Sequence, residues 1–332
     1  MKNKTKILKI SLSVFVVSAL ILSALFISDR NRRYDFAEKN TFAMGTILTQ
    51  KIYSDKAGGH ISHITSIVDS LEDIISWRES GSPVAKINKG EKTENAVLAN
   101  ILSDCKKLSE ESGGAFDVTV GNLSRLWSIG EDGERIPSEE EIKEELKNVG
   151  YENINIENGR ISLSSECSID LGAVGKGLAC DYIADYLKVC DDVKGAVVSV
   201  GGSNFAFGSY NKAGDKWRIA IRHPRSNDFL GVLSISEGFV STSGDYERFF
   251  EKDSVRYHHI LNAKTGYPAS SGLISVTVIC NSGLLSDALS TACFILGENE
   301  SRELLEKYNA SAVFVNSDME VSVVGEVDFE VL

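Results

Sequence analysis

Residues 196–209 read A-V-V-S-V-G-G-S-N-F-A-F-G-S, and this stretch sets the fold class. Two runs rich in β-branched and aromatic residues, at 196–200 and 204–209, are separated by Gly201, Gly202 and Ser203. Such runs are typical of strands, and the glycine pair is typical of a tight turn. We therefore predict two consecutive strands here.

Further strand and helix patterns lie on both sides of this stretch. Apolar spacing and capping residues predict helices at 61–75, 96–111, 138–148, 174–189 and 284–296. Strands are expected at 41–53, 217–221, 231–236, 238–241, 257–261 and 274–280. Because strands mostly follow strands and helices lie in groups, the pattern favours an α+β fold. We predict one large mixed domain, mostly of antiparallel sheets with packed helices, over residues 34–332.

The first 33 residues differ from the rest of the chain. Residues 10–28 are uncharged and mostly apolar, and four lysines precede them. As a helix they would span about 28 Å, close to the thickness of a bilayer's hydrocarbon core. We expect residues 1–33 to be a cytoplasmic tail plus an anchor in the cell membrane, with the folded domain extracytoplasmic. A cleaved signal peptide is the alternative.

Charge and cysteine spacing exclude some classes of function. The 332 residues carry a formal net charge of -12, and the first 33 are basic, so the remainder is more acidic still. This excludes nucleic-acid binding through a basic surface. The six cysteines form no C-x-x-C pair, so a zinc ribbon is not expected. Cys280 and Cys293 lie in apolar runs, which is typical of buried free thiols.

A glycine-rich segment, D-L-G-A-V-G-K-G-L-A-C-D, runs from Asp170 to Asp181. Its glycines and Lys176 lead into the helix expected at 174–189, and a helix N-terminus beside a lysine suits a phosphate. The segment is not a Walker A loop, because the glycine spacing is too short and Gly177 stands where Ser or Thr should coordinate magnesium. A tight strand–helix turn with a solvated lysine is the alternative interpretation.

A second polar cluster lies in S-D-A-L-S-T-A-C-F-I-L-G, residues 286–297. Asp287, Ser290 and Thr291 lie at i, i+3 and i+4, so on a helix they share one face. Carboxylate and hydroxyl oxygens are ligands that suit Mg²⁺. The alternative is that these side chains only decorate the first turn of a helix.

Two of the five histidines lie in Y-H-H-I-L-N-A-K-T-G-Y-P, residues 257–268. Histidine can exchange a proton near neutral pH, and the glycine-containing turn beside it can present backbone N–H groups to a ligand. On the strand expected at 257–261, His258 and His259 would point to opposite faces. We therefore expect one of them to be structural.

Together these segments resemble the FAD:protein FMN transferase family, also called ApbE. The similarity runs from about Thr41 to Gly297. The ordered motifs are F-A-M-G-T, S-W, G-A-F-D-V-T-V, D-L-G-A-V-G-K-G, V-G-G, T-S-G-D-Y, H-I-L-N-A-K-T-G-Y-P and S-D-A-L-S-T-A. The chain departs from the family pattern at Asn262-Ala263, where the family usually has Asp-Pro.

The resemblance implies a Mg²⁺-dependent transferase that moves FMN from FAD to a Ser or Thr hydroxyl of an acceptor protein and releases AMP. Acceptors in the family tend to be FMN-binding domains of membrane redox complexes. The implied proton acceptor is His259. The implied FAD contacts are Met44, Trp77, Ala115, Phe116, Asp117, Asp170, Lys176 and Leu261. The implied Mg²⁺ ligands are the carbonyl of Ala173 and the side chains of Asp287, Ser290 and Thr291.

Two other functions fit the same motifs. In the first, water replaces the acceptor hydroxyl, so that the enzyme is an FAD pyrophosphatase. In the second, the protein binds flavin without catalysis, as a carrier or store. Release of AMP without an acceptor would favour the first, and tight FAD binding without metal dependence or AMP would favour the second.

Overall fold

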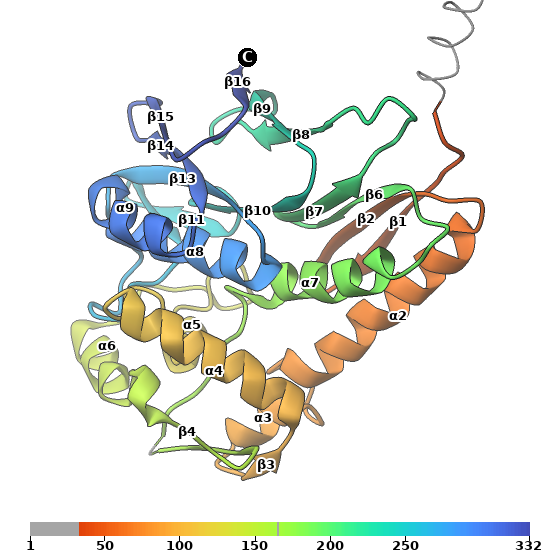
Figure 1. The fold of residues 1–332 in the computed structure, drawn as a ribbon. Coiled ribbons are helices and arrows are strands. Elements are labelled where there is room, and N and C mark those ends of the chain that lie inside the picture. Colours follow the sequence, from red (N-terminus) through yellow and green to blue (C-terminus); the bar gives the residue numbers. More distant parts are fainter. Residues whose placement is uncertain (1–32, 165) are drawn as a thin grey trace, which may run out of the picture.

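The computed structural model of the protein describes residues 33–164 and 166–332. Its centre is an eight-stranded sheet in which every neighbouring pair of strands is antiparallel (Figure 1). In spatial order the strands are β1 (Ala37–Ala43), β2 (Thr46–Tyr53), β6 (Gly195–Val200), β7 (Ser203–Gly208), β10 (Gly238–Gly244), β13 (Leu273–Cys280), β14 (Ser311–Asn316) and β15 (Val321–Val324). The two strands expected within residues 196–209 are β6 and β7, and the fold is α+β with antiparallel sheets, as predicted.

Helices cover one face of this sheet. They are α2 (Ala57–Ile75), α7 (Gly175–Lys188), α8 (Gly283–Leu296) and α9 (Glu298–Lys307) (Figure 1). On α2, Ile64, Val68 and Leu71 recur at helical spacing and are buried in the same core as Leu48 and Ile52 of β2. This apolar stripe explains why the helix expected at 61–75 lies against the sheet.

A smaller sheet lies against part of the other face. It consists of β8 (Trp217–Arg222), β9 (Phe229–Ile235) and β16 (Phe329–Val331). Trp217 and Leu233 from this sheet share a buried cluster with Val240 and Val315 from the large sheet. The large sheet is therefore buried by helices on one side and by strands on the other.

The chain between α2 and α7 builds a separate, mostly helical section. Its elements are α3 (Pro83–Ile87), β3 (Thr93–Glu94), α4 (Ala96–Glu111), α5 (Gly121–Trp127), α6 (Glu139–Glu145), the short 3₁₀ turns η1 (Leu146–Asn148) and η2 (Tyr151–Asn153), β4 (Ile154–Glu157) and β5 (Arg160–Leu163). The hairpin of β11 (Phe249–Lys252) and β12 (Val255–His258) reaches the same section, where Trp127 packs with Leu123, Ile142 and Leu261. The helices expected at 96–111 and 138–148 are α4 and α6 with η1.

Two expected strands differ from the structure. Residues 41–53 form not one strand but two, β1 and β2, which reverse at Met44 and Gly45 with φ of 49° and 67°. Positive φ at both residues matches a tight hairpin turn; Gly45 suits this conformation, but methionine rarely adopts it, so the Met-Gly pair gave only half of the usual turn signal. The strand expected at 257–261 ends at His258.

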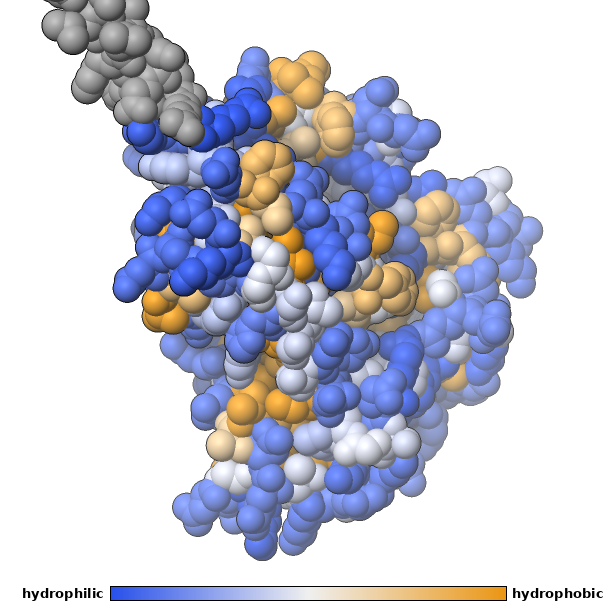
Figure 2. All heavy atoms as spheres, turned by 90° about the vertical axis from the view of Figure 1, so that its right-hand side faces the viewer, coloured by the Kyte–Doolittle hydropathy of each residue, from blue (hydrophilic) through white to orange (hydrophobic). Residues whose placement is uncertain are grey.

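The apolar segment at residues 10–28 lies outside the described residues. Among the helices of residues 33–164 and 166–332, none has the length and apolar character needed to cross a membrane. Figure 2 shows the side on which β1, β2 and α2 lie, where separate apolar spots interrupt a hydrophilic surface. The cross-strand pair Phe42 and Ile47, exposed by 77% and 60%, is apolar surface at the tip of the first hairpin.

We expect Asp181→Ala to destabilise the fold, because Asp181 of α7 caps the start of α8. Its carboxylate accepts hydrogen bonds from the backbone N–H groups of Gly283 (2.6 Å) and Leu284 (2.7 Å). The variant leaves both donors without this acceptor, so the free energy of unfolding should fall by about 2–4 kcal/mol. Urea denaturation measures this loss. The exposed Asp185 on the same helix supplies the control, and a loss no larger than that of Asp185→Ala contradicts the prediction.

Candidate active site

A cavity of about 460 Å³ lies where the large sheet, the N-terminus of α7 and the section around α5 meet. All but one of the site residues implied by the sequence line it: Met44, Trp77, Ala115, Phe116, Asp117, Asp170, Ala173, Lys176, His259, Leu261, Asp287 and Thr291. The exception is Ser290, which is fully buried. Its hydroxyl lies 2.7 Å from the hydroxyl of Ser243 and donates to the carbonyl of Asp287 at 2.8 Å.

The N-terminus of α7 forms one wall of the cavity. Gly172, Ala173, Gly175 and Lys176 line this wall. In the first turn of the helix the N–H of Gly175 donates to the carbonyl of Leu171 at 2.9 Å and the N–H of Gly177 donates to Asp287 at 2.9 Å, which leaves the N–H of Lys176 without an acceptor among the described residues. The Nζ atom of Lys176 donates only a long hydrogen bond, 3.5 Å, to the carbonyl of Gly172. This amide, the helix dipole and the ammonium group together suit a phosphate.

Two glycines bring the first turn of α8 against α7. A Cβ atom on Gly177 would overlap the carbonyl oxygen of Gly283 and would lie 2.7 Å from Cβ of Asp287. The backbones therefore touch, and the N–H of Gly177 donates to Oδ2 of Asp287 at 2.9 Å. This crossing joins the two motifs that the sequence separates by more than 100 residues.

The oxygen atoms at this crossing fit a hard divalent cation. Asp287 is only 4% exposed, and its Oδ1 atom accepts no hydrogen bond from the described residues. Asp287, Thr291 and Ala173 line the same cavity, which provides carboxylate, hydroxyl and carbonyl oxygens. A carboxylate oxygen that lines the cavity without a donor, among other oxygens, suits Mg²⁺ completed by water and phosphate.

Negative charge exceeds positive charge around the cavity. The lining carboxylates belong to Glu72, Asp117, Glu131, Asp170, Glu247 and Asp287, and the lining cations to Arg78, Lys176 and Arg248. Burial raises the pKa of Asp117, although its carboxylate accepts from the N–H groups of Thr119 and Tyr151. A pyrophosphate would be repelled by these carboxylates unless a cation accompanied it.

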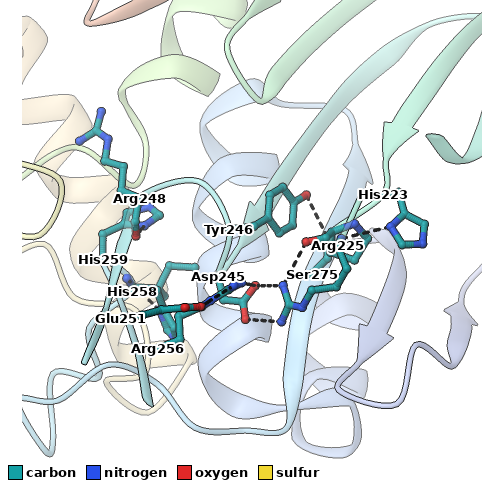
Figure 3. A network of polar contacts seen from close by, with 12 residues as sticks. His223, Arg225, Asp245, Tyr246, Arg248, Glu251, Arg256, His258, His259 and Ser275 are labelled. Carbon is teal, nitrogen blue, oxygen red and sulfur yellow. Dashed lines mark hydrogen bonds and ion pairs between the residues drawn. The ribbon is translucent and has the colours of Figure 1, made fainter. Parts of the chain in front are cut away.

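The hydrogen bond at Nδ1 fixes the tautomer of His259. The carbonyl of Arg248 accepts from the backbone N–H of His259 at 3.1 Å and lies 3.2 Å from its Nδ1 atom (Figure 3). A carbonyl can only accept, so Nδ1 carries the proton and Nε2 keeps its lone pair. The Nε2 atom is therefore the one that can accept a proton in the cavity.

The protein around the cavity keeps His259 neutral. The imidazole is exposed to solvent in the cavity. Desolvation by the protein atoms around it is the first cause of its lowered pKa, and the positive charges of Arg248 and Lys176 add to it, so the pKa of His259 falls to about 3. Negative charge brought by a bound ligand would raise this pKa again. His259 is thus unprotonated at neutral pH before the ligand arrives, and more basic once an anion is bound.

The neighbouring His258 is structural, as one of the pair was expected to be. It is buried, its Nε2 atom donates to the carbonyl of Ala269 at 3.0 Å, and its Nδ1 atom accepts from the N–H of Ile260 at 3.3 Å. Burial lowers the pKa of His258. Both ring nitrogens are occupied, so this side chain has no free group for chemistry.

Apolar and aromatic side chains form another part of the lining. Met44 is held at the hairpin turn by its N–H, which donates to Glu72 at 3.0 Å. Trp77 follows α2 and carries the guanidinium of Arg78 4.2 Å from its ring centre. These residues lie with Phe116 in the lining, where flat rings can pack against a planar ligand.

Several lining residues were missed from the sequence. Among them, Glu72 is one turn before the end of α2, Arg78 directly follows Trp77, and Glu247 and Arg248 follow the T-S-G-D-Y motif. The signal available was their position beside a motif. Charged residues at such positions are usually solvated, so position alone did not single them out.

The K-T-G turn at 264–266 lines no part of the cavity, contrary to the expectation that it faces a ligand. A Cβ atom on Gly266 would collide with Ile142, and the carbonyl of Gly266 accepts from Nε1 of Trp127 at 2.8 Å. The turn persists without the family's usual Asp-Pro, because Oδ1 of Asn262 accepts from the N–H of Lys264 at 2.9 Å. Its role is structural, holding the section around α5.

Four features together define a site for phosphate-ester chemistry. They are the N-terminus of α7, a lysine, a set of hard oxygen atoms and a neutral imidazole. The family described as ApbE matches residues 44–314. The FAD:protein FMN transferase of Treponema pallidum is 31% identical over 321 residues, covering 88% of this chain and 87% of that protein. The FAD:protein FMN transferase of Vibrio cholerae is 31% identical over 255 residues, covering 74% and 75%.

Solved structures agree with these relatives. The crystal structure of the ApbE protein from Thermotoga maritima has a TM-score of 0.82 at 31% identity, covering 87% of this chain and 97% of that one. The apo flavinyl transferase ApbE of Pseudomonas stutzeri has a TM-score of 0.78 at 29% identity, covering 88% and 95%. The chain belongs to the ApbE family and is an enzyme of the transferase class.

Proposed function

We propose that this protein is a Mg²⁺-dependent FAD:protein FMN transferase, whose catalytic domain is residues 34–332. One observation carries the proposal: His259 Nε2, with its free lone pair, shares a cavity with Lys176, the start of α7 and the unsatisfied oxygen of Asp287. These groups are a base, a phosphate site and a cation site. The names of the similar proteins and the cavity's aromatic lining support flavin as the ligand.

The reaction follows from the positions of these groups. A Ser or Thr hydroxyl of the acceptor protein attacks the phosphorus of the FMN half of FAD, and His259 Nε2 takes the hydroxyl proton. The new P–O bond joins FMN to the acceptor as the bond to AMP breaks. Lys176 and the α7 amides stabilise charge on the phosphate oxygens. The metal, held by Ala173, Asp287 and Thr291, would supply further neutralisation of that charge.

Intact mass spectrometry tests this function. The full-length chain in detergent is incubated with FAD, Mg²⁺ and an acceptor peptide bearing a Ser/Thr-Gly-Ala-Thr-like segment. We expect the peptide to gain the mass of FMN less one water while AMP appears in equal amount. AMP formation at the same rate without acceptor would identify a pyrophosphatase, and FAD binding without AMP would identify a carrier.

We further propose that the enzyme is anchored in the cell membrane by residues 10–28, with its catalytic domain extracytoplasmic. Its acceptors would then be FMN-binding domains of membrane redox complexes. The apolar, lysine-preceded segment supports this location. Protease added to intact spheroplasts should digest the catalytic domain. Full protection that ends only on lysis would contradict the orientation.

Removal of the metal should weaken FAD binding, because the cavity carboxylates then repel the pyrophosphate without a counter-cation. We expect excess EDTA to raise the Kd for FAD by at least about tenfold. Quenching of flavin fluorescence on binding measures this Kd. Added Mg²⁺ should restore the affinity. In Asp287→Asn the Mg²⁺ dependence should be much reduced, and a variant that responds like the native enzyme would contradict the assignment of Asp287.

The depressed pKa of His259 leads to a prediction on pH. A lowered pKa means that the base is unprotonated down to about pH 3, so protonation of His259 should not reduce kcat/KM between pH 8 and pH 5. The profile of kcat/KM against pH, which reports the free enzyme, measures this. An acid limb near 6.5, the ordinary value for histidine, would contradict the prediction.

A further inference from the structure

An ion pair between a buried carboxylate and a partly exposed guanidinium lies close to the active-site cavity without lining it. Asp245 is 7% exposed, and Arg225 grips its carboxylate with two parallel hydrogen bonds, 2.7 Å from Nη1 to Oδ1 and 2.6 Å from Nη2 to Oδ2 (Figure 3). Arg256 of β12 approaches Oδ1 at 3.6 Å. Such a two-pronged pair fixes orientation as well as charge.

Asp245 anchors the segment that forms the cavity wall beside His259. Immediately before it, Ser243 and Gly244 line the cavity, and shortly after it Glu247 and Arg248 line it too. Only two residues separate Asp245 from Arg248, whose carbonyl holds Nδ1 of His259. Displacing this carboxylate would therefore displace that carbonyl.

The other partner comes from a different layer of the fold. Arg225 lies in the connection between β8 and β9, where its N–H donates to Nδ1 of His223 at 3.1 Å and its Nη1 also donates to the carbonyl of Pro224 at 3.1 Å. The guanidinium is thus oriented by its own loop before it meets Asp245. The ion pair fastens the cavity wall to the small sheet on the far side of the large one.

We propose that Arg225 and Asp245 are positioning residues for the transfer reaction. Their ion pair holds residues 245–248 so that the Arg248 carbonyl keeps the proton of His259 on Nδ1 and the lone pair on Nε2. The inference rests on the proposed function for the role of His259 as base. Neither Arg225 nor Asp245 lines the cavity, so both act through the backbone.

Loss of the guanidinium leaves a buried carboxylate with Arg256 as its remaining cation. A carboxylate in that position draws in water or moves toward Arg256, and the backbone that carries it moves with it. Once the carbonyl of Arg248 shifts by about 1 Å, Nδ1 loses its acceptor and the proton can occupy Nε2 instead. That tautomer cannot take a proton from the acceptor hydroxyl.

The test compares Arg225→Met, Arg225→Lys and a control in the full-length enzyme with FAD, Mg²⁺ and the acceptor peptide. We expect Arg225→Met to lower kcat roughly 10²-fold while KM for FAD changes less than about twofold. Lysine keeps the positive charge but cannot form the two parallel hydrogen bonds, so the loss of kcat in Arg225→Lys should be smaller than in Arg225→Met. The control Arg218→Met, which removes an exposed pair with Glu330 (3.2 Å) on the same small sheet, should keep native kcat.

Nitrogen-15 NMR of the His259 ring supplies a readout that does not depend on activity. The native enzyme should show one tautomer, protonated on Nδ1, and the Arg225 variants should show a mixture. Native kcat in a folded Arg225 variant would overturn the proposal, as would a lowered kcat with an unchanged tautomer. If Arg225→Met does not fold, Arg225→Lys decides by the same two measurements. A native enzyme that shows the tautomer but transfers no flavin refutes the proposed function instead.

Discussion

His259→Ala should lower kcat for flavin transfer by roughly 10²–10⁴-fold, the usual contribution of a positioned general base. The side chain lines the cavity and is not part of the hydrophobic core, and the hydrogen bonds of this residue go only to Arg248. FAD affinity and thermal stability should therefore stay near native values. Rates of FMN attachment to the acceptor, read by intact mass, measure the loss.

A second histidine serves as the control for this substitution. His63 lies exposed on α2, where it packs on Tyr186 with ring centres 4.2 Å apart, and it does not line the cavity. His63→Ala should transfer flavin at the native rate. Native turnover by His259→Ala, or an equal loss in both variants, would remove the assignment of the base.

Gly177→Ala is the second change with a large expected effect, because it forces α7 and α8 apart. The added methyl group would overlap the carbonyl of Gly283, which is backbone and cannot rotate away. Overpacking of this kind costs about 1–3 kcal/mol, and the separation also breaks the hydrogen bond from Gly177 to Asp287. We expect a lower melting temperature and, at temperatures where the protein is folded, a severalfold weaker Mg²⁺ dependence of FAD binding.

Gly58→Ala provides a matched control for the glycine change. Gly58 lies in the first turn of α2, and a Cβ atom there would meet nothing within 4 Å. Alanine at such a position stabilises helices by up to about 1 kcal/mol. Calorimetry should show the two variants moving in opposite directions. A Gly177→Ala protein as stable as the native one would show that the helices do not touch as described.

Nearly all of the site residues that the motifs implied line the cavity, whereas the local geometry of the cavity could not be predicted. Apolar periodicity located α2, α4 and α8, because each buries one stripe of side chains. The turn at Met44 was not predicted, because a methionine rarely has a left-handed backbone, and here a hydrogen bond to Glu72 stabilises it. A sequence pattern shows only the conformational preference of neighbouring residues, whereas this turn depends on a partner 28 residues away.

The hydrogen-bond partners of individual side chains could not be predicted, because they depend on how distant segments pack together. Ser290 shares the helix face of Asp287 and Thr291, yet its hydroxyl is directed to Ser243 on β10. Similarly, His258 and His259 differ not through strand alternation but because one finds two backbone partners and the other faces an opening. The ion pair of Arg225 and Asp245 forms where two layers of the fold meet, which the sequence of neither segment shows.

The contact between Gly177 and Asp287 spans 110 positions of the chain. During translation the phosphate-binding helix leaves the ribosome well before the carboxylate that completes its cation site. A nascent or truncated polypeptide that ends before residue 283 would contain the N-terminus of α7 but would lack Asp287 and Thr291, two of the residues proposed to hold the metal. Under the proposed function, the metal site therefore forms only after the segment from Gly283 onward has been synthesised and has folded.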